Sequence, residues 1–246
     1  MAPPRADGGG APAPGRVQGT SSYQTKSDVA RQHIQEMILS GSARAGARIT
    51  AREVSEALGM SETPIREAIR GLAAEGWLDF NAHLGVVVAS VRSEHIVEVY
   101  AIRGALGALA IQLGGACYTA AQLAEIDANL AESQAAVEAD DTTQYARLNR
   151  AFHLLLSDTP NTLWTLKLLT TLWAQTSAAR RGFEAVPGRL RESLAEHRAI
   201  RAAIGAHDFA RAAALLIEHE RVAGMALIAG LSQSRASSSP ADRPVP

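Results

Sequence analysis

The stretch from Ile49 to Trp77 restricts the possible folds of this chain most. Apolar residues recur in it at the spacings of α-helices, so two short helices can bury a common apolar seam. Gly59 supplies a permissive backbone position between them. The seam consists of Ala57, Leu58, Ile65, Ala68, Ile69 and Leu72. The spacing predicts two short helices joined by a tight turn, with a third segment behind them, which is the layout of a helix-turn-helix.

The second helix of this pair is predicted to begin near Glu62. Ser61 precedes it, and a serine at the N-cap can accept a hydrogen bond from a backbone N–H of the first turn. Pro64 falls in that first turn, where its missing N–H costs nothing. If this helix lies in a major groove of DNA, its early residues, among them Thr63 and Arg66, face base edges and phosphates.

Residues 53–78 resemble the winged helix-turn-helix of the GntR family of bacterial transcriptional regulators, in particular its FadR-like branch. Three motifs carry the resemblance in order: a Gly-x-x-x-x-Gly segment from Gly41 to Gly46, Ser-x-Thr-Pro-x-Arg-Glu-Ala at 61–68, and the apolar run that begins at Gly85. Short β-type runs at 78–80 and 86–88 predict a two-stranded wing. We therefore expect a winged helix-turn-helix domain over residues 25–91.

The spacing and the resemblance together assign contacts with double-stranded DNA. Arg52, Thr63 and Arg66 are expected to contact bases or phosphates, and Arg70 a phosphate. Glu62 stands where the family commonly has an arginine, so its carboxylate either accepts from a cytosine amino group or merely repels phosphate. With the N-cap and the wing included, the predicted DNA-binding residues are Arg52, Ser61, Glu62, Thr63, Arg66, Arg70, His83 and Gly85.

Net charge gives no sign of a nucleic-acid partner. The chain carries 24 Lys and Arg against 25 Asp and Glu, whereas DNA-binding proteins usually show a basic domain or stripe. Affinity for DNA must then come from local arginines, although some of them simply pair with neighbouring glutamates in solvent. The arginines of this region are Arg44, Arg48, Arg52, Arg66 and Arg70, and the interleaved glutamates are Glu53, Glu56, Glu62 and Glu67.

The composition suits a mainly α protein. Of 246 residues, 47% are hydrophobic but only 4% aromatic, which is typical of packed helices rich in Ala and Leu. Cys117 is the single cysteine, so no intramolecular disulfide can form and we expect a cytoplasmic protein. We find no apolar run long enough to span a bilayer and expect no membrane partner. Residues 1–24 and 233–246 are expected to be disordered tails.

Residues 92–232 are predicted to form an all-helical domain. Turn signals divide this region into about six helices, which we expect to form an antiparallel bundle. The region resembles the all-helical effector-binding domain, of the FCD type, that follows the DNA-binding module in the FadR-like branch. The resemblance implies that the domain binds an effector and mediates a homodimer.

Three histidines lie on apolar faces of these predicted helices: His153, His197 and His219. Neutral imidazoles bind Zn, Ni, Fe or Cu, and Asn149, one turn before His153, offers an oxygen ligand. A histidine on an apolar face can also be a hydrogen-bonded core residue. The resemblance favours a divalent metal ion, because a subset of these domains binds one through the pattern (Asp/Asn)-x-x-x-His, His and His. Asn149 stands where aspartate is commoner, so we expect a weaker or differently selective site.

Arg103 is predicted to lie on or beside the inward face of a helix, where a guanidinium requires a partner. The resemblance implies that an arginine here holds the carboxylate of a small organic acid next to the metal. An internal salt bridge is the alternative. Gly107 stands where relatives often carry glutamate, and the loss of that partner favours a ligand role for Arg103.

We therefore expect a metabolite-responsive transcriptional regulator, a homodimer that binds a near-palindromic operator and responds to a small organic acid in a metal-containing pocket. Two alternatives stay open: a metal-dependent enzyme acting on such an acid, and a regulator whose metal is purely structural. No general base is evident beside the histidines, and the sequence has no H-E-x-x-H, G-x-S-x-G or G-x-x-x-x-G-K-[ST] motif. We therefore do not expect an enzyme.

Overall fold

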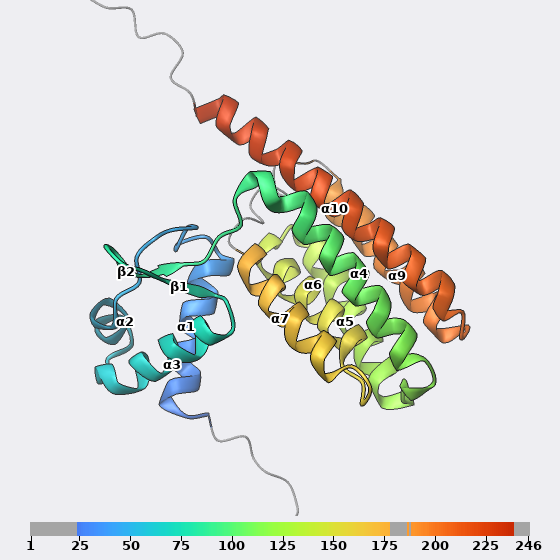
Figure 1. The fold of residues 1–246 in the computed structure, drawn as a ribbon, viewed down its shortest axis with the longest axis horizontal. Helices are drawn as coiled ribbons and strands as arrows, with labels where there is room; N and C mark the ends of the chain where they lie inside the picture. Colours follow the sequence, from blue (N-terminus) through green and yellow to red (C-terminus); the bar gives the residue numbers. More distant parts are fainter. Residues whose placement is uncertain (1–23, 178–185, 187, 239–246) are drawn as a thin grey trace, which may run out of the picture.

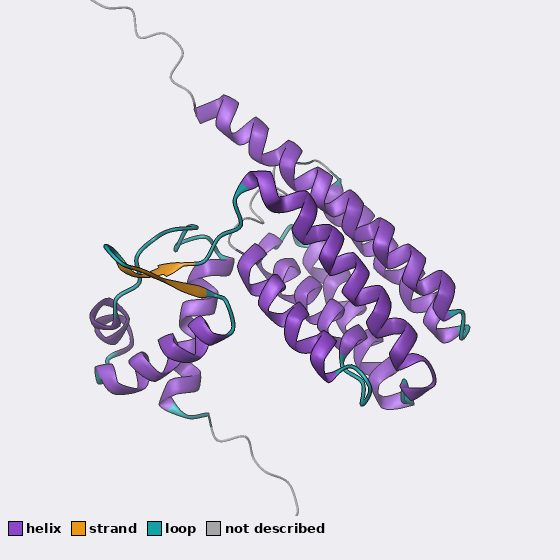
Figure 2. Cartoon of the chain, viewed as in Figure 1, coloured by secondary structure: helices purple, strands orange, loops and turns teal. Residues whose placement is uncertain are grey.

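The computed structural model describes residues 24–177, 186 and 188–238 (Figure 1). The chain forms two regions, which we call the reader, residues 24–91, and the helical domain, residues 92–238. Helices dominate both, and the two short strands of the reader are the only strands among the residues described (Figure 2). The prediction of a mainly α protein with a small β wing is confirmed.

The reader contains the predicted helix-turn-helix. Thr50 begins the first helix of the motif with a capping box, in which Thr50 and Glu53 each accept a hydrogen bond from the other's backbone N–H. Gly59 ends that helix in a left-handed conformation (φ 62°), which glycine adopts without strain, and so allows the tight turn. The elements of the reader are α1 (Lys26–Leu39), α2 (Ala51–Leu58), α3 (Glu62–Ala74), β1 (Leu78–Asn81) and β2 (Gly85–Val88).

Ser61 occupies the N-cap position of α3 with an extended backbone, but its side chain makes no capping hydrogen bond. The predicted cap interaction is therefore wrong. A serine cap accepts from the backbone N–H of the second or third helical residue. The third helical residue is Pro64, which has no N–H, so one of the two usual donors is missing. The Ser61 side chain is exposed and faces solvent.

The predicted wing is present as an antiparallel pair of strands in which Phe80 lies opposite Val86. Asn81 closes the turn between them, because its Oδ1 accepts hydrogen bonds from the backbone N–H groups of His83 and Leu84, both at 2.9 Å. This turn presents His83 at the tip of the wing.

The helical domain is a bundle of two layers. Helices α7, α4 and α10 lie side by side in the front layer of Figure 1, and α6, α5 and α9 form the layer behind. Two 3₁₀ turns, η1 (Ser93–His95) and η2 (Gly115–Cys117), flank the first long helix. The helices are α4 (Ile96–Gly114), α5 (Ala120–Glu138), α6 (Thr142–Ser157), α7 (Leu163–Ser177), α9 (Arg189–Gly205) and α10 (Phe209–Ser238).

Helices α4 and α10 approach closely because glycines remove side chains from their contact. A Cβ atom at Gly107 would lie 2.6 Å from Leu216 Cδ2, and one at Gly224 would lie 3.0 Å from Tyr100 Cβ. This approach brings Glu220 of α10 within bonding distance of α4.

Two expectations from the sequence need correction. Helix α10 continues to Ser238, so residues 233–238 are helical and not part of a disordered tail; residues 1–23 and 239–246 lie outside the described residues. The helix Ser93–Cys117, with mean hydropathy 1.5, is long and apolar enough to cross a membrane by length and composition. Glu98 and Arg103 interrupt this run, which is why a search for an uninterrupted apolar stretch misses it. Of the apolar 18-residue window of this helix, 44% is buried. The helix packs against α10 and α7 within the bundle.

Candidate functional site

The reader carries a groove of about 500 Å³ between the recognition helix α3, the start of α2 and the wing. It brings together five of the predicted DNA-binding residues: Arg52, Glu62, Arg66, Arg70 and Gly85. The other three predicted residues, Ser61, Thr63 and His83, are not part of its lining. The groove combines a concave shape with a concentration of arginines, which suits a DNA backbone.

Among the other residues that line the groove, Arg48 and Phe80 offer a charge and an aromatic ring, and neither was assigned to DNA from the sequence. Arg48 lies just before α2, and Phe80 lies on β1 with 70% of its surface exposed. Arg48 had a signal in the sequence, because it belongs to the local arginines of the motif. Phe80 had none, because alternation with the buried Leu78 predicts that its side chain lies on the inner face of the wing.

Two of the four arginines of the groove pair with glutamates one helical turn away. Arg66 Nη2 donates to Glu62 Oε2 at 2.6 Å, and Arg52 Nε donates to Glu56 Oε1 at 2.8 Å. The side chains of Arg66 and Glu62 are 64% and 42% exposed. Ion pairs in such an exposed position contribute little to stability. A DNA phosphate can therefore replace the glutamate at small cost.

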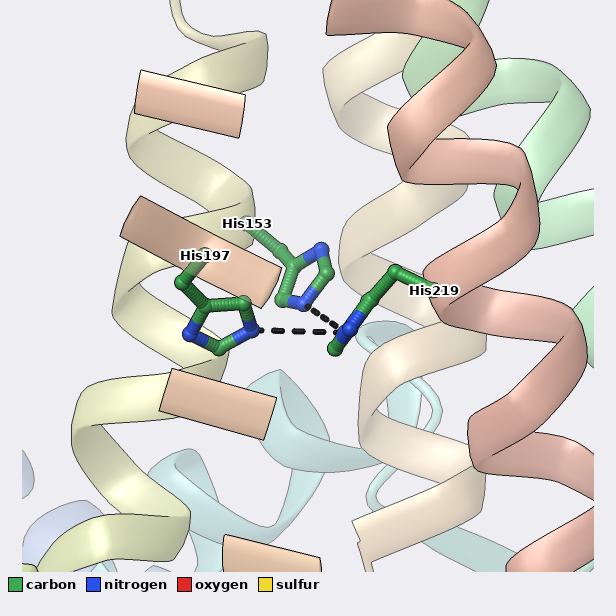
Figure 3. Close-up of side chains that lie close together, drawn as sticks. All are labelled: His153, His197 and His219. Carbon is green, nitrogen blue, oxygen red and sulfur yellow. Dashed lines mark hydrogen bonds between the residues drawn. The ribbon is translucent and has the colours of Figure 1, made fainter. Parts of the chain in front are cut away.

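In the helical domain, the three predicted histidines converge (Figure 3). His153 comes from α6, His197 from α9 and His219 from α10, and all three are at most 4% exposed. The Nε2 atom of His219 lies 3.3 Å from that of His197 and 3.2 Å from that of His153. All three potential ligand atoms lie within 4.8 Å of one another.

Carboxylates lie behind two of these imidazoles. His219 Nδ1 lies 2.6 Å from Glu196 Oε2, and His153 Nδ1 lies 3.5 Å from Glu220 Oε1. Burial alone would raise the pKa of Glu196, but hydrogen bonds from Arg189 and His219 outweigh it and lower that pKa to about 2. The ionised Glu196 accepts the Nδ1 proton of His219, which leaves the lone pair of Nε2 directed into the cluster.

This set of donors fits a divalent metal ion. Unprotonated nitrogen atoms 3.2 and 3.3 Å apart repel one another unless a proton or a cation lies between them. Three neutral imidazoles are a common ligand set for zinc, which keeps a further coordination position for water or another ligand. Nickel and related metals also accept imidazole nitrogen.

A small cavity of about 20 Å³ lies beside the cluster. Its lining includes His219, Asn149, Trp173 and two arginines, Arg103 and Arg189. The structure thus places Asn149 and Arg103 next to the histidine cluster. A cavity of this volume holds about one water molecule. A small organic acid therefore fits only if side chains of the lining move.

Arg103 forms the internal salt bridge that was the alternative to its predicted ligand role. Its Nη2 donates to Glu220 Oε1 at 2.9 Å and its Nη1 to Thr176 Oγ1 at 3.1 Å. The guanidinium also lies 3.4 Å from the centre of the Trp173 ring. The argument from Gly107 therefore fails, because Glu220, 117 residues further along the chain, supplies the carboxylate.

Arg189 is a second buried arginine at this site, and the sequence reading missed it. It is 2% exposed, and its two terminal nitrogens donate to the two oxygens of Glu196 at 2.7 and 2.6 Å. The seven-residue spacing of Arg189 and Glu196 places them two turns apart on one face of α9, which was the available signal. Arg189 thereby orients the carboxylate that orients His219.

Comparison with known proteins agrees with this architecture. Residues 26–88 match the bacterial regulatory proteins of the gntR family, and residues 98–221 match the FCD domain. The chain is 28% identical over 200 residues to the HTH-type transcriptional regulator McbR of Escherichia coli (strain K12), covering 80% of this chain and 88% of McbR. It is 31% identical over 140 residues to the "Probable D-xylose utilization operon transcriptional repressor" of Paenarthrobacter nicotinovorans, covering 56% of this chain and 62% of that protein.

Solved structures show the same fold. The structure of E. coli McbR/YncC, 27% identical, aligns with a TM-score of 0.72 over 86% of this chain and 99% of that one. A GntR regulator from Rhodococcus sp. RHA1, 20% identical, aligns with a TM-score of 0.69 over 83% of this chain and 98% of that one. The named relatives are transcriptional regulators and not enzymes. The chain therefore belongs to the GntR family of bacterial regulatory proteins, and it is a transcriptional regulator that joins a GntR DNA-binding domain to an FCD domain.

Proposed function

We propose that this regulator senses a small organic acid through a divalent metal ion in its helical domain and adjusts its binding to DNA accordingly. The observation that carries this proposal is the convergence of three buried imidazoles, from three different helices, beside a cavity lined by two arginines. A packed apolar core has no need for three such groups, because each buried polar atom requires a partner.

His153, His197 and His219 would hold the metal, and Asn149 would add an oxygen ligand from one turn before His153. A bound zinc or nickel ion supplies a positive centre that attracts an anionic group. Arg103 lines the cavity and offers N–H donors to a carboxylate. The acid would then take over hydrogen bonds that Glu220 accepts in the structure described here.

The metal is tested by calorimetric titration of the metal-free full-length protein with Zn²⁺ and Ni²⁺. We expect one site per chain in the unaltered protein and loss of that site in His197→Ala. The matched control is His207→Ala, which alters a histidine outside the cluster. Equal metal binding by all three proteins would overturn the metal site.

We further propose that the regulator is a cytoplasmic homodimer whose two readers bind the half-sites of a near-palindromic operator. Affinity for DNA from its own upstream region should fall steeply as salt rises, because bound phosphates release counterions. Half-sites should lie about 34 Å apart, one turn of the duplex. A footprint over a single half-site, or DNA binding that does not respond to salt, would contradict this arrangement.

A purely structural metal is the second candidate, and the small cavity favours it. A volume of about 20 Å³ leaves no room for an organic acid, and Arg103 already has a carboxylate partner. In that case Zn²⁺ would raise the melting temperature of the protein, while no acid would alter its DNA affinity. A regulator that senses an acid would show both the rise in melting temperature with Zn²⁺ and a change of DNA affinity with the acid.

A further inference from the structure

The reader and the helical domain meet at the end of α3. Trp77, which follows this helix, is 1% exposed. Its neighbour Gly76 lies against α7, because a Cβ atom there would lie 3.0 Å from Thr171 Cγ2 and 3.3 Å from the Thr171 carbonyl oxygen. Ala174 of α7 belongs to the apolar core of the reader. We call the contact of residues 76–77 with α6 and α7 the Trp77 interface.

Arg150 of α6 is the charged member of this interface. Its guanidinium carbon lies 5.1 Å from the centre of the Trp77 ring, within the range of a cation–π interaction. Burial lowers the pKa of Arg150 to about 10, which still leaves the side chain cationic at neutral pH. The nearby acid Glu75 accepts a hydrogen bond from Arg31. Glu75 also favours the charged form of Arg150, and the Trp77 ring is the aromatic group against which Arg150 rests.

The helices that contact the reader also form walls of the cavity beside the histidine cluster. On α6, Asn149 lines the cavity and directly precedes Arg150; on α7, Trp173 lines it and directly precedes Ala174. The ring of Trp173 lies 4.7 Å from that of His153. Successive side chains of a helix diverge by about 100°. Each of the two helices therefore directs one residue to the cavity and the next to the reader.

The Trp77 interface is not fully satisfied by hydrogen bonds. The Nε1 atom of Trp77 and the Nε atom of Arg150 are both buried, and neither has a hydrogen-bond partner within the described part of the chain. Buried N–H groups normally have a partner, and contact with water would supply one to each. Separation of the reader would expose both groups to water, which would offset part of the loss of apolar contact.

We propose that Arg150 is a positioning residue that holds the reader in one orientation through Trp77, and that this contact responds when a metal ion binds at the histidine cluster beside the neighbouring cavity. Positioning by Arg150 requires no ligand. The response of the Arg150–Trp77 contact to a bound metal ion rests on the proposed metal site.

The test is a distance measurement by pulsed electron resonance on the full-length chain with Cys117→Ser. Spin labels at Glu67→Cys in α3 and Glu132→Cys in α5 report the placement of the reader, since both positions are exposed and lie in different regions. Labelled protein is diluted with unlabelled protein, so that each dimer contains at most one labelled chain. The distribution is recorded with and without Zn²⁺.

Arg150→Met keeps the length of the side chain but removes its charge, and we expect the loss of the single narrow distance of the parent protein. Arg150→Lys keeps a cation and should retain that distance. The matched control is Arg147→Met on the same helix, because Arg147 pairs with Glu36 of the reader across the same boundary but lies 40% exposed. This control should also retain it.

A narrow, unshifted distance in Arg150→Met would overturn the positioning role. If that variant fails to fold, as judged by circular dichroism, Arg150→Gln is measured against the same criterion. Zn²⁺ should alter the distribution of the parent protein but not that of Arg150→Met, and should raise the melting temperature of both. Bound Zn²⁺ without any change of distance in the parent would overturn the response to the metal. Absence of Zn²⁺ binding would contradict the metal site, while the Arg150 distances would still decide the positioning role.

Discussion

The reader and the helical domain both contain arginine–glutamate pairs, but in opposite surroundings. Arg66 and Glu62 of the reader are 64% and 42% exposed, whereas Arg103 and Glu220 of the helical domain are 2% exposed each. Water screens the first pair, so its members exchange partners at little cost. Removal of one member of the second pair leaves a buried charge without compensation. Arg66 can thus exchange its glutamate for a phosphate, while Arg103 can bind an organic acid only if its bond to Glu220 breaks.

Breaking the buried pair should have the largest effect on stability. We expect Glu220→Ala to lower the free energy of unfolding by about 3–5 kcal/mol, because Arg103 then lies buried without its carboxylate. Urea denaturation measures this loss. The matched control is Glu62→Ala, which should cost less than about 1 kcal/mol because its pair is exposed. Equal losses in both variants would remove the contrast between the two regions.

The surface pair should matter for DNA instead. Arg66→Ala is expected to weaken operator binding by about 1–3 kcal/mol if Arg66 reads a guanine, with little change in the melting temperature. Glu62→Gln should keep or increase the affinity, since it frees the guanidinium from its partner. Fluorescence anisotropy with labelled operator DNA measures both. Unchanged affinity in Arg66→Ala would place the recognition surface elsewhere.

The expectation that Asn149, in place of an aspartate, weakens the metal site can be tested at the histidine cluster. Asn149→Asp adds a carboxylate beside the cluster and should tighten Zn²⁺ binding by roughly 10-fold. The control is Asn129→Asp, which alters a buried asparagine of α5 that donates to the Leu148 carbonyl oxygen and lies outside the cluster. Competition against a chromophoric chelator measures the affinity. Tighter binding in the control variant would show a general charge effect and not ligation by residue 149.

The smallest effect is expected at the exposed cap of α2. Hydrogen bonds from the Thr50 side chain and backbone lower the pKa of Glu53 below its usual value. The ionised cap therefore stabilises the folded chain above that usual value, and this contribution disappears as the pH falls through the lowered pKa. Glu53→Gln should consequently lose less stability on acidification than the parent, in thermal melts between about pH 6 and pH 3. An identical pH dependence of both proteins would show that the cap contributes nothing.

The features that the sequence predicted correctly, the helices and the two-stranded wing, are those encoded over short stretches of chain. Apolar spacing identified the helix-turn-helix, and intervals of three and four residues placed His153, His197 and His219 on inward faces. These signals are local, because a helix fixes which of its residues share a face. Asn149 lies four residues before His153 and so shares its face of α6. It lines the same cavity as His219.

The features that were missed depend on which helices are neighbours. The Arg103 and Glu220 side chains meet only because α4 and α10 pack together, and no local pattern connects residues 117 positions apart. The contact of Arg150 with Trp77 likewise joins two domains. The Ser61 cap interaction is absent, and Pro64 removes one of the two backbone N–H groups that a serine cap usually bonds.

Gly107 also limits how this site can change over generations. A side chain there would require the flexible end of the Leu216 side chain to move aside. The same helix carries His219 and Glu220, so the space for a carboxylate at position 107 would have to come from Leu216. Relocating the acid that neutralises Arg103 would thus require two substitutions, the gain of an acid at position 107 and the loss of Glu220, and either one alone would leave a buried charge without a partner.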